Sequence, residues 1–264
     1  MIMSNSKPLI FVTNDDGVCA QGIEALIDIA RSFGDVVVVA PLSPQSCMSH
    51  AVTLKHPLRY QKMKEEEGLV IYGCNGTPVD CVKLGLSELV DRKPDLLLSG
   101  INHGGNSSVN MMYSGTVAAA AEGVLYNIPC MAFSLCDHAL VTDFSTSIHY
   151  GKIIVQQALE KGFPKDVCLN INIPKLSVTE IKGIRLCRQN KSVWVEKLVR
   201  NIDPYNKPYF WFTADMLNHE PDASDTDEAA LAEGYISIMP MQFDYTAYKA
   251  LDEMKVNWAD INSK

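Results

Sequence analysis

The strongest constraint on the fold is a strand–helix–strand pattern near the N-terminus. Residues 8–12 form a short apolar run, residues 22–31 carry apolar side chains at helical spacing, and residues 36–40 form a second, β-branched run. Both runs are too apolar for strands with one solvated face, which indicates strands buried on both faces of a parallel sheet. The pattern predicts a βαβ unit and therefore an α/β fold.

The same alternation continues through most of the chain. Three more helices and three more strands are expected, the helices at residues 78–90, 116–126 and 147–161 and the strands at residues 95–99, 129–134 and 167–173. These elements predict a Rossmann-like, doubly wound and mostly parallel sheet between two helical layers, with its core over residues 8–175.

After about Pro174 the pattern changes. The expected elements are two strands of antiparallel type, an aromatic strand, a short helix and a final strand, at residues 184–188, 192–199, 209–212, 227–233 and 235–239. We therefore expect a β-rich C-terminal part over residues 176–264, within one domain that spans residues 1–264. Its aromatic, hairpin-like segment is expected to serve contact between subunits.

Composition bears on compartment and partners. The net charge of −8 over 264 residues gives little attraction to a phosphate backbone, so a nucleic-acid duplex is not an expected partner. No apolar run approaches the ~20 residues that span a bilayer, so no membrane partner is expected either. With no secretory apolar segment and no C-x-x-C pair among eight cysteines, a cytoplasmic protein with reduced thiols is expected.

Polar side chains follow several predicted strands at their carboxyl ends. Asp15 and Asp16 follow the first strand, Ser46 lies in the loop after the second, and Asn102 follows residues 95–99. Ligands of open α/β sheets bind at this edge. Adjacent carboxylates repel each other unless a cation lies between them. Carboxylate, hydroxyl and amide oxygens suit Mg²⁺ or Mn²⁺ rather than zinc.

Each of these residues also has a structural interpretation that local sequence leaves open. Asp15 or Asp16 can N-cap the following helix, Ser46 can be a turn residue, and Asn102 can occupy a left-handed turn position. His103 is the one histidine that we expect near the site, although a solvent-facing loop position explains it better.

The segment that opens the Ala-rich helix at residues 116–126 carries candidate phosphate ligands. Its hydroxyls can cap the helix, or they can present O–H and backbone N–H groups to a phosphate. The sequence has no Gly-Lys-Ser/Thr of a P-loop and no G-x-G-x-x-G of a dinucleotide site. The candidate substrate-binding residues are Asn14, Asn106, Ser114, Gly115 and Thr116.

Several short motifs occur together in this chain. They are Val-Thr-Asn-Asp-Asp-Gly at residues 12–17, Gly-Thr-Pro-Val-Asp-Cys at 76–81, Pro-Asp-Leu-Leu-Leu-Ser-Gly-Ile-Asn at 94–102 and Tyr-Ser-Gly-Thr at 113–116. In this order and spacing they resemble the SurE family of stationary-phase survival proteins, and the resemblance extends over roughly residues 8–246. The set is far more specific than any one motif.

The resemblance implies a metal-dependent 5′-nucleotidase that hydrolyses nucleoside 5′- and 3′-monophosphates. It also implies a cytoplasmic location and a homodimer or homotetramer built with the C-terminal extension. By position, the family's metal ligands fall on Asp15, Asp16, Ser46 and Asn102, which would hold one Mg²⁺ or Mn²⁺ per subunit. Asp15 or Asp16 would also orient or deprotonate the attacking water.

The chain departs from the family pattern in two segments. Cys47 stands where the family usually has Gly after the ligand Ser, and Val109 and Asn110 stand where an acidic residue usually precedes the Tyr of the last motif. The first departure is expected to alter the shape of the loop. The second is expected to alter substrate preference or pH dependence.

Two other functions remain open from sequence. One is a covalent aspartyl phosphatase with Asp15 as nucleophile, although such enzymes usually pair carboxylates at alternate positions and Gly17 stands there instead. The other is a non-catalytic nucleotide-binding or sensor module, against which the multi-ligand metal set argues.

Overall fold

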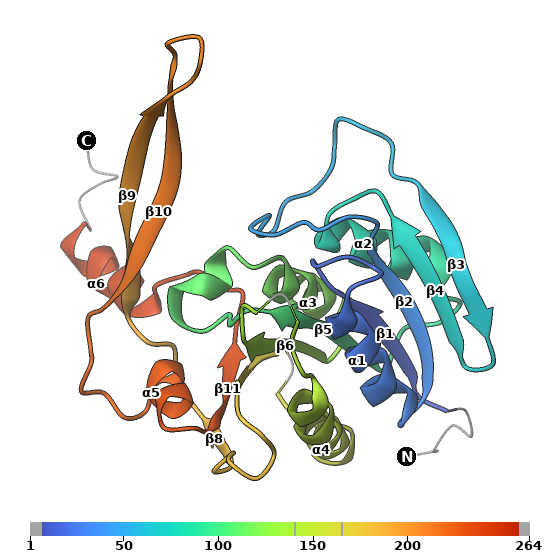
Figure 1. The fold of residues 1–264 in the computed structure, drawn as a ribbon. Coiled ribbons are helices and arrows are strands. Elements are labelled where there is room, and N and C mark those ends of the chain that lie inside the picture. Colours follow the sequence, from blue (N-terminus) through green and yellow to red (C-terminus); the bar gives the residue numbers. More distant parts are fainter. Residues whose placement is uncertain (1–6, 140, 165, 259–264) are drawn as a thin grey trace.

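A nine-stranded sheet forms the centre of the molecule (Figure 1). The structure is a computed structural model that describes residues 7–139, 141–164 and 166–258. From one edge to the other the strands are β3 (Tyr60–Glu66), β4 (Leu69–Cys74), β2 (Asp35–Pro41), β1 (Leu9–Thr13), β5 (Leu96–His103), β6 (Cys130–Cys136), β7 (Cys168–Pro174), β11 (Ile236–Met241) and β8 (Ile184–Leu186). Neighbouring strands are parallel, except that β3 is antiparallel to β4 and β11 is antiparallel to β7.

Helices cover both faces of this sheet. Helices α1 (Gln21–Arg31) and α4 (Ser145–Lys161) pack on one face, and α2 (Pro78–Leu84) and α3 (Gly115–Leu125) pack on the other. Side chains alternate along β1 between the two cores, Ile10 and Val12 facing the first pair and Leu9 and Phe11 facing the second. Burial on both faces explains why the strand reads as a continuous apolar run. The predicted three-layer, mostly parallel α/β fold is confirmed.

The helix expected at residues 78–90 is shorter than predicted. Its N-terminus has a capping box, in which the Thr77 side chain accepts from the backbone of Asp80 and the Asp80 side chain accepts from the backbone of Thr77. The α-helix ends at Leu84, and a π-helical turn, η1 (Gly85–Leu89), continues it.

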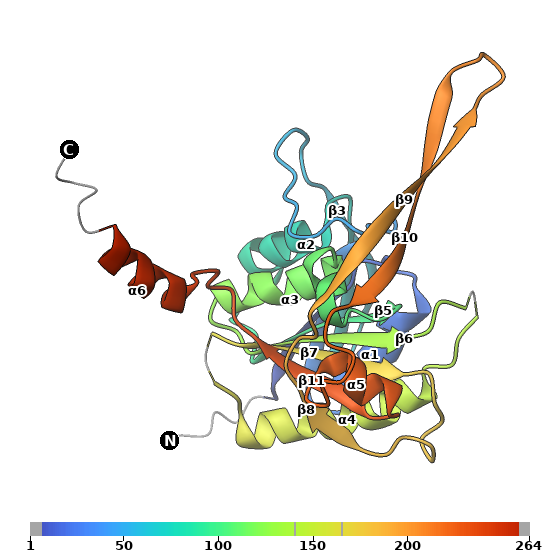
Figure 2. The ribbon, with the colours of Figure 1, turned by 90° about the vertical axis from the view of Figure 1, so that its left-hand side faces the viewer.

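The C-terminal part extends the sheet and adds a separate hairpin. Strand β8 lies parallel to β11, so the antiparallel pairing expected for residues 184–188 is wrong. Strands β9 (Ser192–Ile202) and β10 (Pro208–Asn218) form a two-stranded antiparallel hairpin that projects away from the sheet (Figures 1 and 2). Helix α5 (Asp227–Ala232) precedes β11, and helix α6 (Tyr248–Asn257) stands away from the sheet in Figure 2.

Two properties concern the described residues as a whole. No helix among them combines the length and the apolar composition that crossing a membrane requires. All eight cysteines lie in the described ranges, and none of them forms a disulfide.

The connections of the sheet diverge between β1 and β5. The chain leaves β1 into α1 on one face, and it leaves β5 toward α3 on the opposite face. Because β1 and β5 are neighbours, this is a topological switch point, where open α/β sheets form a crevice at the carboxyl ends of the strands.

Candidate functional site

A pocket of about 500 Å³ lies at this crevice. Its lining includes all four predicted metal ligands and two of the predicted substrate-binding residues, namely Asp15, Asp16, Ser46, Asn102, Asn106 and Ser114. These residues come from the ends of β1 and β5, from the loop after β2 and from the N-terminus of α3. The fold therefore brings together side chains that are up to about one hundred residues apart in sequence.

Asp15 and Asp16 follow directly after β1. Asp15 is 4% exposed and accepts a hydrogen bond from the hydroxyl of Thr116. Asp16 is half-buried, and its Oδ2 accepts the backbone N–H of His103 at 3.0 Å. Burial raises the pKa of Asp15 to about 6, with the bond from Thr116 acting against this and the charge of Asp16 adding to it. Burial also raises the pKa of Asp16.

Asn102 and Ser46 reach the same pocket from two other segments. Asn102 lies near the end of β5, where its Nδ2 donates to the carbonyl of Gly104 at 2.6 Å. Ser46 is exposed in the loop of residues 42–59 between β2 and β3. The backbone N–H of its neighbour Gln45 donates to the carbonyl of Asp15 at 2.7 Å. This bond ties the loop to the segment that carries the carboxylates.

Further contacts anchor the loop of residues 42–59. The backbone N–H of Thr53 donates to Asp80 Oδ1 at 3.0 Å. Nε2 of His50 lies 2.8 Å from a carboxylate oxygen of Glu122, which is buried in α3. The same carboxylate accepts from Lys83 Nζ at 2.6 Å. The loop is thus attached to both α2 and α3, which restricts the positions available to Ser46.

The N-terminus of α3 opens into the pocket. Ser114 is its N-cap, and Ser114 Oγ accepts the backbone N–H of Val117 at 3.2 Å. The Ser114 O–H is still able to donate to a ligand. At Gly115, an added Cβ would lie 2.8 Å from Cβ of Asp15, so glycine allows the helix end to approach the carboxylate. A helix N-terminus favours a bound anion.

Three predicted substrate-binding residues lie outside the lining. The amide of Asn14 is fully buried and bonds both the carbonyl of Gly17 at 3.0 Å and its N–H at 3.2 Å. Thr116 is also fully buried, and its hydroxyl donates a hydrogen bond to the carboxylate of Asp15. Gly115 contributes the close approach described above. In this structure these residues shape the pocket and do not reach into it.

Other lining residues carried no site prediction. His103 lies in the pocket wall, near the site as expected, but its Nε2 is buried, so the solvent-facing position favoured from sequence is wrong. Tyr113, His138 and Trp194 also line the pocket, although sequence reasoning did not select them. Tyr113 is the first residue of the Tyr-Ser-Gly-Thr motif at residues 113–116, which is a usable signal. Trp194 comes from the hairpin strand β9, and no local pattern links it to the other residues.

The lining fits a hard divalent cation. Two carboxylates, a hydroxyl and an amide oxygen form an oxygen-only donor set. No lysine or arginine is among the described residues that line the pocket, so no protein cation there offsets the two carboxylates. No group of three His, Cys, Asp or Glu side chains suited to a metal occurs within residues 7–139, 141–164 and 166–258. The donor set therefore favours Mg²⁺ or Mn²⁺ over zinc.

Comparison with known proteins establishes the family. The profile of the family described as Survival protein SurE matches residues 10–196. The chain belongs to the SurE family. Two SurE relatives carry the name 5′-nucleotidase SurE. The one from Phocaeicola vulgatus is 46% identical over 97% of this chain and 98% of its own. The one from Flavobacterium psychrophilum is 49% identical over 97% of this chain and 99% of its own.

A solved structure of a SurE protein has the same fold. The crystal structure of the SurE protein from Aquifex aeolicus superimposes with a TM-score of 0.82 at 39% sequence identity, covering 94% of this chain and 99% of that one. The similarity therefore extends beyond the sheet and its helices into the C-terminal part of this SurE chain.

Proposed function

We propose that this chain is a metal-dependent phosphomonoesterase that hydrolyses nucleoside 5′- and 3′-monophosphates to nucleoside and phosphate in the cytoplasm. One observation carries the proposal: Asp15, Asp16 and the N-terminus of α3 converge on one pocket at the switch point. Such a pocket offers a cation site beside an anion site, as hydrolysis of a phosphate ester requires. The names of the relatives supply the 5′-nucleotidase activity.

Asp15, Asp16, Ser46 and Asn102 would hold one divalent ion, Mg²⁺ or Mn²⁺. Such an ion, when bound, acts as a Lewis acid on the phosphoryl group and lowers the pKa of a bound water. The hydrogen bonds from Thr116 to Asp15 and from His103 to Asp16 orient the two carboxylates, and contacts of this kind commonly tune metal ligands.

The remaining residues act on the phosphate. The Ser114 hydroxyl and the N-terminal N–H groups of α3 would bind the phosphoryl oxygens and stabilise their developing charge. Asp15 or Asp16 would orient the attacking water or accept its proton. These donors belong to a fixed helix end, so they need little rearrangement during the reaction.

The test is phosphate release from 5′-AMP and 3′-AMP with Mn²⁺, with Mg²⁺ and with chelator. We expect turnover only with a divalent ion. Asp16→Asn, which removes one anionic ligand, should lower kcat/KM by about 100-fold or more. Asp222→Asn changes an exposed carboxylate outside the pocket and serves as the matched control.

Two results would overturn the proposal. Full activity in chelator would show that hydrolysis needs no divalent ion. Full activity of Asp16→Asn would show that Asp16 is not a required metal ligand. A phosphorylated enzyme trapped on Asp15 would instead support a covalent aspartyl mechanism, and stoichiometric nucleotide binding without turnover would support a sensor.

A further inference from the structure

The wall of the pocket contains side chains that the proposed hydrolysis does not use. Beyond the carboxylates and the helix terminus, its lining includes Asn110, Tyr113 and Trp194. The volume of about 500 Å³ falls within the range of about 300–1,000 Å³ typical of small-molecule sites. It therefore leaves room for more than a phosphate group.

Trp194 is held in a defined orientation in the pocket wall. The residue is half-buried on β9, and its indole Nε1 donates to Oδ1 of Asn110 at 3.0 Å. This bond satisfies the one polar atom of the ring, so the rest of the indole is a fixed aromatic wall. Asn110 lies in the 3₁₀ turn η2 (Ser108–Met112). Its Nδ2 forms no hydrogen bond within the described chain and can donate to a ligand.

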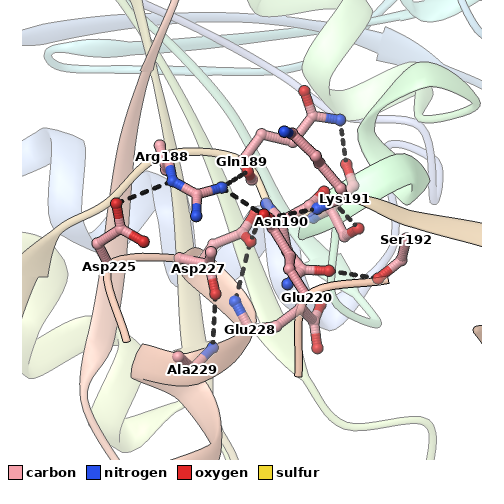
Figure 3. A network of polar contacts seen from close by, with 12 residues as sticks. Arg188, Gln189, Asn190, Lys191, Ser192, Glu220, Asp225, Asp227, Glu228 and Ala229 are labelled. Carbon is pink, nitrogen blue, oxygen red and sulfur yellow. Dashed lines mark hydrogen bonds and ion pairs between the residues drawn. The ribbon is translucent and has the colours of Figure 1, made fainter. Parts of the chain in front are cut away.

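One buried carboxylate fixes the segments that carry both residues. Figure 3 shows Asp227 at the base of the hairpin, where it is fully buried. Its Oδ2 accepts the backbone N–H of Ser108 at 2.7 Å, two residues before Asn110. Its Oδ1 accepts the backbone N–H of Asn190 at 2.9 Å, four residues before Trp194.

Additional bonds stiffen the hairpin base. The hydroxyl of Ser108 donates to the carbonyl of Asn190 at 3.0 Å. The guanidinium of Arg188 pairs with Glu220 at 2.6 Å and with Asp225 at 2.8 Å (Figure 3). The aromatic wall is thus preorganised relative to the rest of the pocket, and preorganisation lowers the entropic cost of binding.

We propose that Trp194 and Asn110 form the subsite for the nucleobase of the substrate, an inference that rests on the proposed nucleotidase function. A planar heteroaromatic base stacks on an indole, and the amide of Asn110 can donate to a nitrogen or oxygen on the edge of the base. A base is uncharged, so the acidic pocket does not repel it. Because every base has a π-face, the subsite selects for the presence of a base more strongly than for its identity.

The test compares 5′-AMP with ribose 5-phosphate, which keeps the sugar and phosphate but lacks the base. With the Mn²⁺-loaded protein, Trp194→Ala should lower kcat/KM for AMP about tenfold and leave ribose 5-phosphate unchanged. Trp194→Phe, which keeps an aromatic face, should retain most of the activity. Trp211→Ala removes a 64% exposed tryptophan of β10 and is the matched control, expected to change neither substrate.

The outcomes separate this subsite from the proposed function. An equal loss on both substrates would assign Trp194 a structural role only and overturn the subsite, as would unchanged turnover of AMP. Wild-type protein that hydrolyses neither substrate would refute the nucleotidase function. In that case calorimetric titration with each compound decides the subsite. AMP binding that Trp194→Ala abolishes upholds it, and AMP binding that the variant keeps, or no binding at all, overturns it.

Discussion

Asp15 is a carboxylate that the fold shields from most of the solvent, although it lines the pocket. The side chain is 4% exposed, and Asp16 lies beside it. The hydroxyl of Thr116 stabilises the ionised form, but the loss of solvation outweighs this bond and the pKa rises to about 6. The fold therefore holds a carboxylate that is unfavourable without a cation, as expected for a residue kept for metal binding rather than for stability.

The raised pKa of Asp15 predicts how the free energy of unfolding depends on pH in chelator. The pKa of Asp15 in the folded state, about 6, lies above its usual value of 3.8. The stabilising contribution of Asp15 to the free energy of unfolding is therefore fully present below about pH 4, and it is lost as the pH rises through about 6. Asp15→Asn stays neutral, so its effect on the free energy of unfolding should be more favourable at about pH 8 than at about pH 4.5, by about 2 kcal/mol.

Urea unfolding at the two pH values measures this difference, with Asp222→Asn as the exposed control. With saturating Mn²⁺ the wild type should instead be more stable than Asp15→Asn, because the ion stabilises the wild type and binds the variant weakly. A variant that is equally destabilised at both pH values in chelator would contradict the assignment of Asp15 as a desolvated carboxylate.

Local sequence located some residues of the pocket and not others. Asp15 and Asn102 were found because polar residues at the ends of buried parallel strands mark one edge of a sheet. The bond from Thr116 to Asp15 spans 101 positions, and Trp194 arrives on a hairpin. Contacts of this kind depend on tertiary packing, and no periodicity or spacing encodes them.

Among the elements, helix α3 connects the pocket to the loop of residues 42–59, which carries Ser46, through the side chain of Glu122. This carboxylate is 3% exposed and contacts both His50 of the loop and Lys83 of α2. Glu122→Gln keeps the shape of the side chain but weakens both charge-assisted bonds. We expect it to lower the free energy of unfolding by about 1–3 kcal/mol and, because the loop loosens, to raise the Mn²⁺ concentration needed for half-maximal activity several-fold.

Urea unfolding and an Mn²⁺ activation curve provide the two measurements. Glu88→Gln, an exposed change in η1, should alter neither. If Glu122→Gln loses stability while its Mn²⁺ activation curve matches the wild type, Glu122 supports the fold without positioning Ser46.

The elements that sequence reasoning missed were missed for different reasons. Strand β3 is exposed at every position and reads Tyr-Gln-Lys-Met-Lys-Glu-Glu, so it shows no apolar alternation. Helix α6 buries none of its residues, and its apolar side chains Tyr248, Leu251 and Met254 are exposed in this chain and were passed over. Strand β4 is an apolar run like its neighbour β2, and it was passed over. The direction of β8 depends on β11, some fifty residues later, so a local pattern cannot fix it.

For the whole molecule, the net charge of −8 opposes the approach of a phosphate monoester. The repulsion is offset locally, by the N-terminus of α3 and by the divalent ion proposed at Asp15 and Asp16. The rest of the surface can then remain acidic, which favours solubility without excluding an anionic substrate from one pocket.

The hairpin bears on assembly. Leu198 and Phe212 are paired across β9 and β10 and are 61% and 69% exposed. They share a face of the ribbon with Phe210, which is 53% exposed. Apolar side chains gathered in this way mark a contact surface, and closed symmetric oligomers are the commonest assemblies of soluble chains. We propose that this face joins subunits in a homodimer or homotetramer.

Paired substitution Leu198→Asp with Phe212→Asp should therefore reduce the solution mass, measured by light scattering after gel filtration, to that of one 29.1 kDa chain. Buried carboxylates would repel each other across the interface, whereas they are solvated on a free hairpin. Ser87→Asp with Thr179→Asp adds the same charge at exposed positions outside the hairpin and should leave the mass unchanged. A monomeric wild type, or an unchanged mass of the first variant, would show that this face does not join subunits.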